Sequence, residues 1–300
     1  MADFRPVNRS DRLLYELMPV LVGIGLDGDL RCYGSCFIAW RHMAITAKHV
    51  FEELLRNDPG LASGEQCKYE YWVVQVIWDG NDHDYVVWTI DSAATSPHSD
   101  IAILWLRALN DRAARYKEWK LVPMTFDPPP VGAVIRGFGL HNVRFDGSRV
   151  AADGKLEHLE LTFDRSISTG TIKQHYWDKR DRGMYNFPCM EVDARFDHGM
   201  SGGLVIDEQS RACGIVCGSL PANSADEEHV SYVSMFWPMM AIPVETRLVP
   251  GGVATNQYRL KDMSARGVFT PVGWDRVLIE DQLASGGALS IRYLRIERPQ

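Results

Sequence analysis

The sequence predicts an all-β fold in two portions, with few and short helices. Most of the chain consists of apolar runs rich in Val, Ile, Tyr, Trp and Phe, separated by Gly, Asp and Asn. These residue types favour strands, and short strands separated by turn residues are typical of barrels and sandwiches. Three consecutive prolines at 128–130 cannot donate sheet hydrogen bonds, so 126–132 is expected to connect the two portions.

The expected elements follow the chain in order. Helical pieces are expected near 10–17, over 49–58 and over 109–120. The strand-like runs are 17–26, 34–40, 42–47, 69–78, 84–90, 100–106, 133–140, 159–163, 202–206, 211–218 and 230–237, with a last one at 288–296. We therefore divide the chain into an N-terminal segment (1–16), a first β-rich portion (17–125) and a second (126–247), each with enough strands for a small β-barrel, and a C-terminal extension (248–300).

Composition excludes several classes of protein. The chain of 300 residues has 46% hydrophobic and 10% aromatic residues, which indicates a folded protein rather than a disordered one. Its net charge of −7 gives no general attraction to nucleic acid or to an anionic membrane. The N-terminus lacks the basic-then-apolar order of a secretory signal, and no apolar run is long enough to span a bilayer.

The cysteines and histidines do not indicate a metal site. Six cysteines without a signal sequence are expected to be reduced thiols in a cytoplasmic protein. No CxxC pair occurs, and the run "HMAITAKH" at 42–49 does not have HExxH spacing. We expect no metal and no cofactor.

The run "GMSGGLVID" at 199–207 is the first candidate site. Glycines at this density weaken strands and helices, so the backbone there must bend tightly or be approached closely. Ser201 is the one hydroxyl between them. A serine is a poor nucleophile until a base takes its proton, so the alternative is a turn in which the serine has no chemical role.

Two other residues could complete a catalytic site. His49 stands where an apolar run meets the start of a helix, so packing would hold its ring; the alternative is a structural histidine. Asp100 leads directly into the apolar run 100–106, where a carboxylate needs a hydrogen-bond partner such as a histidine N–H. Its alternative is a cap at the edge of a strand.

Taken together, these segments resemble a known family. "TAKHV", "SDIAIL" and "GMSGGLV" occur in the order His, Asp, Ser, and are similar to the motifs of the chymotrypsin-like or trypsin-like serine peptidases. The stretches "GSCFIAW", "VGAVIRGFG", "TGTI", "RACGIVCG" and "MMAIPVE" also look like segments of that family. The resemblance covers about residues 17–247 and implies two six-stranded antiparallel β-barrels.

The resemblance also implies roles for individual residues. His49 would be the general base and then the general acid, Asp100 would orient it, and Ser201 would be the nucleophile. The N–H groups of Gly199 and Ser201 would form an oxyanion hole. Cys217, Gly218 and Ser219 look like the strand that pairs with an extended polypeptide substrate.

Departures from the family pattern leave specificity and activation open. Val50 stands where secreted relatives have a cysteine, and Met200 stands where they have an activating aspartate. Arg195, six residues before the serine, either reads acidic substrate side chains or is a solvated charge. Two alternatives to an independently active serine endopeptidase remain: a protease-like peptide-binding module, and a protease activated by a protein partner.

Overall fold

The computed structural model describes ten stretches of the chain. They are residues 3–7, 11–26, 28–63, 66–79, 82–150, 156–220, 229–249, 251–253, 257–280 and 290–295.

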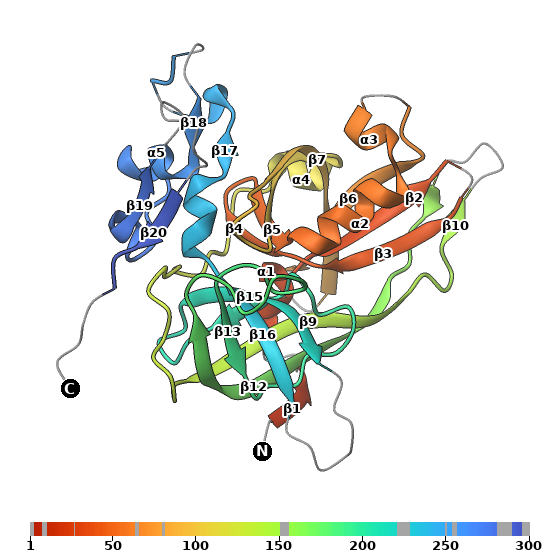
Figure 1. Ribbon diagram of the computed structural model, residues 1–300. Coiled ribbons are helices and arrows are strands. Elements are labelled where there is room, and N and C mark those ends of the chain that lie inside the picture. The colour runs from red at the N-terminus through yellow and green to blue at the C-terminus, as the bar shows by residue number, and fades with distance from the viewer. Residues whose placement is uncertain are drawn as a thin grey trace.

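The first portion of the chain forms one antiparallel sheet of seven strands, coloured orange to yellow in Figure 1. Its spatial order is β3-β2-β6-β7-β8-β5-β4. The strands are β2 (Val20–Gly25), β3 (Leu30–Ser35), β4 (Phe37–Trp40), β5 (Met43–Ala47), β6 (Tyr69–Asp79), β7 (Asp82–Thr95) and β8 (Ile101–Ala108). All of β2 and β5 is buried, which accounts for their nearly continuous apolar sequence.

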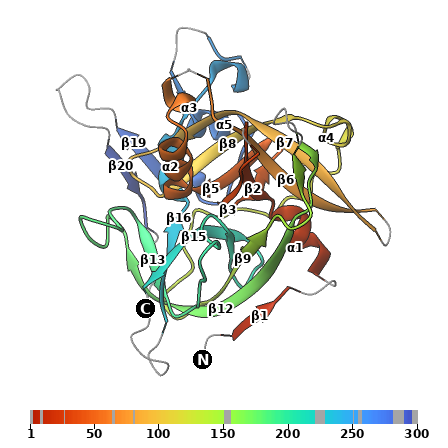
Figure 2. The same cartoon turned by 90° about the vertical axis from the view of Figure 1, so that its right-hand side faces the viewer.

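The second portion closes into a barrel of six strands (Figure 2). The order β12-β13-β16-β15-β14-β9 is completed by pairing of β9 with β12. The strands are β9 (Val134–Arg144), β12 (Thr162–Tyr176), β13 (Cys189–Val192), β14 (Leu204–Ile206), β15 (Ala212–Leu220) and β16 (Val230–Met235). The predicted all-β, double-barrel fold is confirmed, although the first portion is an open half-barrel of seven strands where a barrel of six was expected.

The N-terminal segment contributes a strand to this second barrel. β1 (Asp3–Pro6) pairs antiparallel with β12, with Phe4 opposite Ser168. It lies along the same edge of β12 that β13 occupies further on, and both views show it beside β12 (Figures 1 and 2). The sequence analysis had treated 1–16 as a separate segment.

The helices are short and lie outside the sheets. They are α1 (Arg12–Leu17), α2 (Lys48–Asn57), α3 (Gly60–Ser63), α4 (Asp111–Arg115) and α5 (Leu260–Ala265), with 3₁₀ turns at Trp237–Ala241 (η2), Thr246–Leu248 (η3) and Trp274–Arg276 (η4). No helix among the described residues is long and apolar enough to cross a membrane.

The helix expected over 109–120 is only five residues long. Asn110 caps it by accepting a hydrogen bond from the N–H of Ala113, and the backbone turns to an extended conformation at Tyr116. The rings of Tyr116 and Trp119 then pack on Trp88 in the first sheet. Tertiary packing of these aromatic rings therefore overrides the local helical preference.

The C-terminal extension packs against the connector between the barrels. It contains β18 (Tyr258–Arg259), β19 (Val277–Glu280) and β20 (Ser290–Tyr293), and β18 pairs with β17 (Pro243–Val244) at the end of the second portion. Two further short strands, β10 (Arg149–Val150) and β11 (Leu156–His158), also lie in the second portion. Thr125, directly before the connector, forms a bridge with Val272. The Asp127 carboxylate accepts hydrogen bonds from Arg276 at 2.6 Å and from the Tyr293 hydroxyl.

Candidate active site

Strand pairing in the first sheet brings His49 to Asp100. β5 pairs with β8 so that Ala47 lies opposite Ile101, and α2 begins directly after β5. The Asp100 carboxylate accepts hydrogen bonds from the His49 backbone N–H at 3.0 Å and from Nδ1 at 2.8 Å. The Asp100 side chain is 7% exposed and that of His49 45% exposed, so the ring is held from a buried anchor and still reaches solvent.

The environment of His49 favours its protonated form. Burial alone would lower the pKa of the imidazole, but the hydrogen bond and the charge of Asp100 raise it, as do Glu52 and Glu53. The net pKa lies above the ordinary value of 6.5. A raised pKa is what a general base needs if the imidazolium it forms is to be stabilised.

Cys217 adjoins both Asp100 and Ser201. Burial raises the pKa of its thiol well above the usual value, with smaller contributions from Asp100 and Cys189, so the sulfur keeps its proton. The thiol donates to the Ile215 carbonyl at 3.9 Å. Its backbone carbonyl accepts a hydrogen bond from the Ser201 hydroxyl at 2.9 Å.

Glycines allow the turn that carries Ser201. Gly199 and Gly202 have φ of +94° and +82°, a backbone region that favours glycine. A Cβ at Gly202 would lie 2.2 Å from the Ser35 carbonyl oxygen and 2.4 Å from Thr46 Oγ1. No other residue fits there, which explains the glycine density of the motif.

Ser35 of the first sheet fixes the serine turn of the second barrel. Its hydroxyl donates to the Gly199 carbonyl at 2.9 Å and accepts from the N–H of Leu140 at 2.8 Å. Its backbone N–H donates to the Ser201 carbonyl at 3.1 Å. Thr46 in turn donates to the Ser35 carbonyl at 2.8 Å, and both side chains are fully buried. The sequence analysis missed Ser35.

The N–H groups of Gly199 and Ser201 are free to donate to a ligand as far as the described residues show. Met200 N–H donates to Asp197, Gly202 N–H to Val216 and Gly203 N–H to Met200. Among the described residues, the N–H groups of Gly199 and Ser201 form no hydrogen bond. These are the two donors that the sequence analysis expected to hold an oxyanion.

His49, Gly199 and Ser201 line one cavity of about 490 Å³. His141 and His198, which the sequence analysis did not select, also line it, as does Glu53. His141 is positioned by a hydrogen bond with the Ser166 hydroxyl at 2.7 Å. The Ser201 hydroxyl donates its hydrogen bond to the Cys217 carbonyl and not to His49 in this structure. It must therefore rotate about its Cα–Cβ bond to reach the imidazole.

The residues expected to bind substrate lie in two places. Gly218 and Ser219 continue β15 beyond Cys217, and the Ser219 hydroxyl donates to the Phe196 carbonyl at 2.9 Å. Arg195 lies outside the cavity lining; its guanidinium binds both carboxylate oxygens of Asp197, at 2.7 and 2.9 Å, and stacks over the Phe4 ring. Met200 is fully buried, and its sulfur accepts from the Asp197 N–H.

Comparisons with known proteins cover most of this region. A family model described as "Trypsin-like peptidase domain" matches residues 34–215. No curated protein matches the chain. Similar solved structures include the active form of the Rv3671c protease from M. tuberculosis, with 14% identity, 76% of this chain and 79% of that chain covered and a TM-score of 0.44. Its inactive form has 15% identity, 74% and 84% covered and a TM-score of 0.40.

Proposed function

The chain belongs to the trypsin-like peptidase domain family, and from that premise we propose that it is a serine endopeptidase that works through an acyl-enzyme. The observation that carries the proposal is the cavity in which a histidine, hydrogen-bonded to a buried aspartate, faces the turn that holds Ser201. His49, Asp100 and Ser201 are the residues we assign to catalysis.

The proposed reaction has two halves. The Ser201 hydroxyl turns from the Cys217 carbonyl to His49, passes its proton to Nε2, and its oxygen attacks the substrate carbonyl carbon. The N–H groups of Gly199 and Ser201 donate to the resulting oxyanion, and each such donor contributes about 2.7–4 kcal/mol. His49 then gives the proton to the leaving amine, and a water molecule repeats the sequence on the acyl-enzyme.

Covalent labelling tests the proposal directly. A fluorophosphonate probe is expected to label the full-length protein at Ser201, identified by mass spectrometry of the modified peptide. The Ser201→Ala variant is expected to stay unlabelled, whereas Ser168→Ala, which removes a buried hydroxyl elsewhere in the second barrel, is expected to label normally. Labelling on a residue other than Ser201 contradicts the proposal. So does a complete lack of labelling that persists after a cell extract is added to supply an activating partner.

The raised pKa of His49 predicts the pH dependence. The base must be neutral, so kcat/KM for a peptide substrate is expected to rise with pH and to reach half its plateau above pH 6.5. Glu53→Gln removes a charge that raises this pKa, so its midpoint is expected at lower pH, whereas the exposed Glu208→Gln leaves it unchanged. A midpoint below 6.5, or one that Glu53→Gln moves upward, contradicts this assignment.

The thiol of Cys217 is expected to support Asp100. Cys217→Ala removes the polar thiol that lies close enough to the buried Asp100 carboxylate for that charge to raise its pKa, so the rate of fluorophosphonate labelling is expected to fall by about tenfold. Cys217→Ser keeps a donor of similar size and is expected to retain the rate. Equal labelling rates for the two variants would show that the thiol contributes only packing.

The hydrogen bond from the Ser201 hydroxyl to the Cys217 carbonyl favours a second candidate, a protease activated by a protein partner. In that case the isolated protein labels slowly and the partner accelerates labelling by turning the hydroxyl towards His49. A rate that is already maximal without added protein rejects this candidate. The peptide-binding module without catalysis is rejected by any labelling at Ser201.

We also propose a cytoplasmic location. None of the six cysteines, all of which lie in the described part of the chain, forms a disulfide, which supports a reducing compartment. Recovery of the protein from cells with its cysteines paired in disulfides would contradict this.

A further inference from the structure

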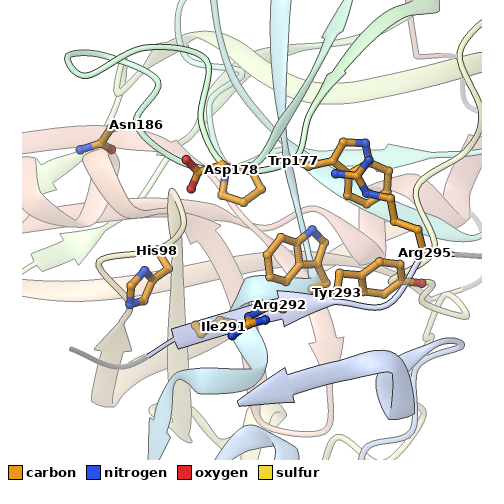
Figure 3. A pocket seen from close by; sticks show the side chains of 10 residues that line it. His98, Trp177, Asp178, Asn186, Ile291, Arg292, Tyr293 and Arg295 are labelled. Atoms are coloured by element: carbon orange, nitrogen blue, oxygen red, sulfur yellow. The ribbon is translucent and has the colours of Figure 1, made fainter. Parts of the chain in front are cut away.

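A second cavity, of about 360 Å³, lies where three parts of the chain meet (Figure 3). His98 comes from the segment that leads into β8, two residues before Asp100. Trp177, Asp178 and Asn186 come from the connection between β12 and β13. The C-terminal extension supplies the remaining side, with Arg292, Tyr293 and Arg295. The resemblance to the peptidase family does not cover this third part.

Aromatic rings form one wall of this second cavity. Trp177 and Tyr293 are stacked with their centroids 5.9 Å apart, and Trp237 packs on Tyr293 at 6.0 Å. The guanidinium of Arg295 lies 4.4 Å from the centroid of the Trp177 ring, and Figure 3 shows the two side by side. Stacking on an indole holds a guanidinium in place without neutralising it.

Arg295 is the charge in this cavity that is left to bind a ligand. Arg292 is paired with Glu280 at 2.9 Å, and Asp178 has the Lys179 ammonium 3.9 Å away. Arg295 has no carboxylate partner among the described residues. A guanidinium without a carboxylate partner in the described part of the chain selects an anionic ligand with acceptor oxygens.

The cavity adjoins the strand assigned to the substrate. A Cβ at Gly218 would lie 3.4 Å from the Tyr185 hydroxyl, so Tyr185 borders that strand. The next residue, Asn186, already lines the cavity. Tyr185 and Asn186 therefore connect the strand assigned to the substrate with the edge of this cavity.

We propose that this second cavity binds an acidic side chain of the polypeptide substrate, several residues from the bond that is cut. The proposal rests on the proposed function, because it takes the occupant of the cleft to be a substrate. The carboxylate pairs with the planar guanidinium of Arg295, while the aromatic wall excludes water from one side of the pair. The extension thereby becomes part of substrate recognition.

Binding to the inactive Ser201→Ala variant tests this without requiring turnover. The probes are a fluorescein-labelled peptide of alternating Glu and Gly and its Gln–Gly counterpart, compared by fluorescence anisotropy at low salt. The Glu peptide is expected to bind about tenfold more tightly than the Gln peptide. Adding Arg295→Gln is expected to remove that preference and to leave the affinity for the Gln peptide unchanged.

Matched controls separate this result from general electrostatics. Arg115→Gln removes an exposed arginine on α4 and is expected to keep the preference for the Glu peptide. Equal affinity for the two peptides, or a preference that survives Arg295→Gln, overturns the proposal. Free glutamate and unlabelled Glu peptide are then compared as competitors of the labelled Glu peptide. If free glutamate competes at the same concentration as the peptide, the site binds a free carboxylate and not a side chain of a polypeptide substrate, and the proposal is overturned. Neither result affects labelling at Ser201, so failure here is distinct from failure of the proposed function.

Discussion

Replacing Asp100 by Asn is expected to lower kcat about 10⁴-fold at neutral pH while leaving the fold intact. The carboxylate now accepts two hydrogen bonds from His49, one from the backbone N–H and one from Nδ1. An asparagine oxygen can keep the first, but its NH₂ group must then face Nδ1. That arrangement places the ring proton on Nε2, where it prevents the imidazole from taking the proton of Ser201.

Steady-state kinetics with a cleaved peptide substrate measure this effect. Circular dichroism and thermal unfolding check that the variant folds, and KM is expected to change little because Asp100 is buried beneath the ring. A loss of less than tenfold in kcat would show that His49 does not depend on Asp100 for its tautomer, and the assignment of the three catalytic residues would then be wrong.

Replacing Ser35 by Ala is expected to produce the second largest effect. The substitution leaves the Gly199 carbonyl and the buried Leu140 N–H without their partner. An unsatisfied buried polar group costs about 1–3 kcal/mol, so unfolding is expected to become easier by about 2–6 kcal/mol. The Gly199 turn also loses its tether, and because the oxyanion donors belong to this turn, kcat is expected to fall by about 10²-fold.

Denaturant unfolding and kinetics on the same samples distinguish the two consequences. Ser168→Ala is the matched control, because Ser168 is equally buried but its hydroxyl has no hydrogen-bond partner among the described residues. We expect Ser168→Ala to change neither quantity appreciably. A Ser35→Ala variant that is destabilised but fully active would show that the turn keeps its geometry without this contact.

The sequence was sufficient for the features that depend on local chemistry. Short β-branched and aromatic runs predicted the strands, and the glycines around Ser201 predicted a tight turn, because both signals lie in consecutive residues. Ser35 could not be found in this way. Its contact with Gly199 joins residues 164 apart, and a serine near the end of a strand has no distinguishing local pattern.

Contacts between distant parts of the chain also account for the other differences. The short α4 reflects packing of Tyr116 and Trp119 on Trp88, and the second cavity requires residues from both barrels and the extension. Arg195 stands six residues before Ser201, the position expected for a residue that recognises a substrate side chain. Its guanidinium, however, donates to both carboxylate oxygens of Asp197. Its role in substrate binding therefore stays a prediction.

The pairing of β1 with β12 bears on how the protein is made. The register joins Asp3 to Thr169 and Pro6 to Ser166, so residues 3–6 cannot take their places until the chain has been translated beyond residue 169. Pairing over such a separation closes a long loop and is slow compared with hairpin formation. During synthesis the nascent chain therefore carries an unpaired N-terminal strand, and later an open strand edge, both of which invite association with other chains until they meet.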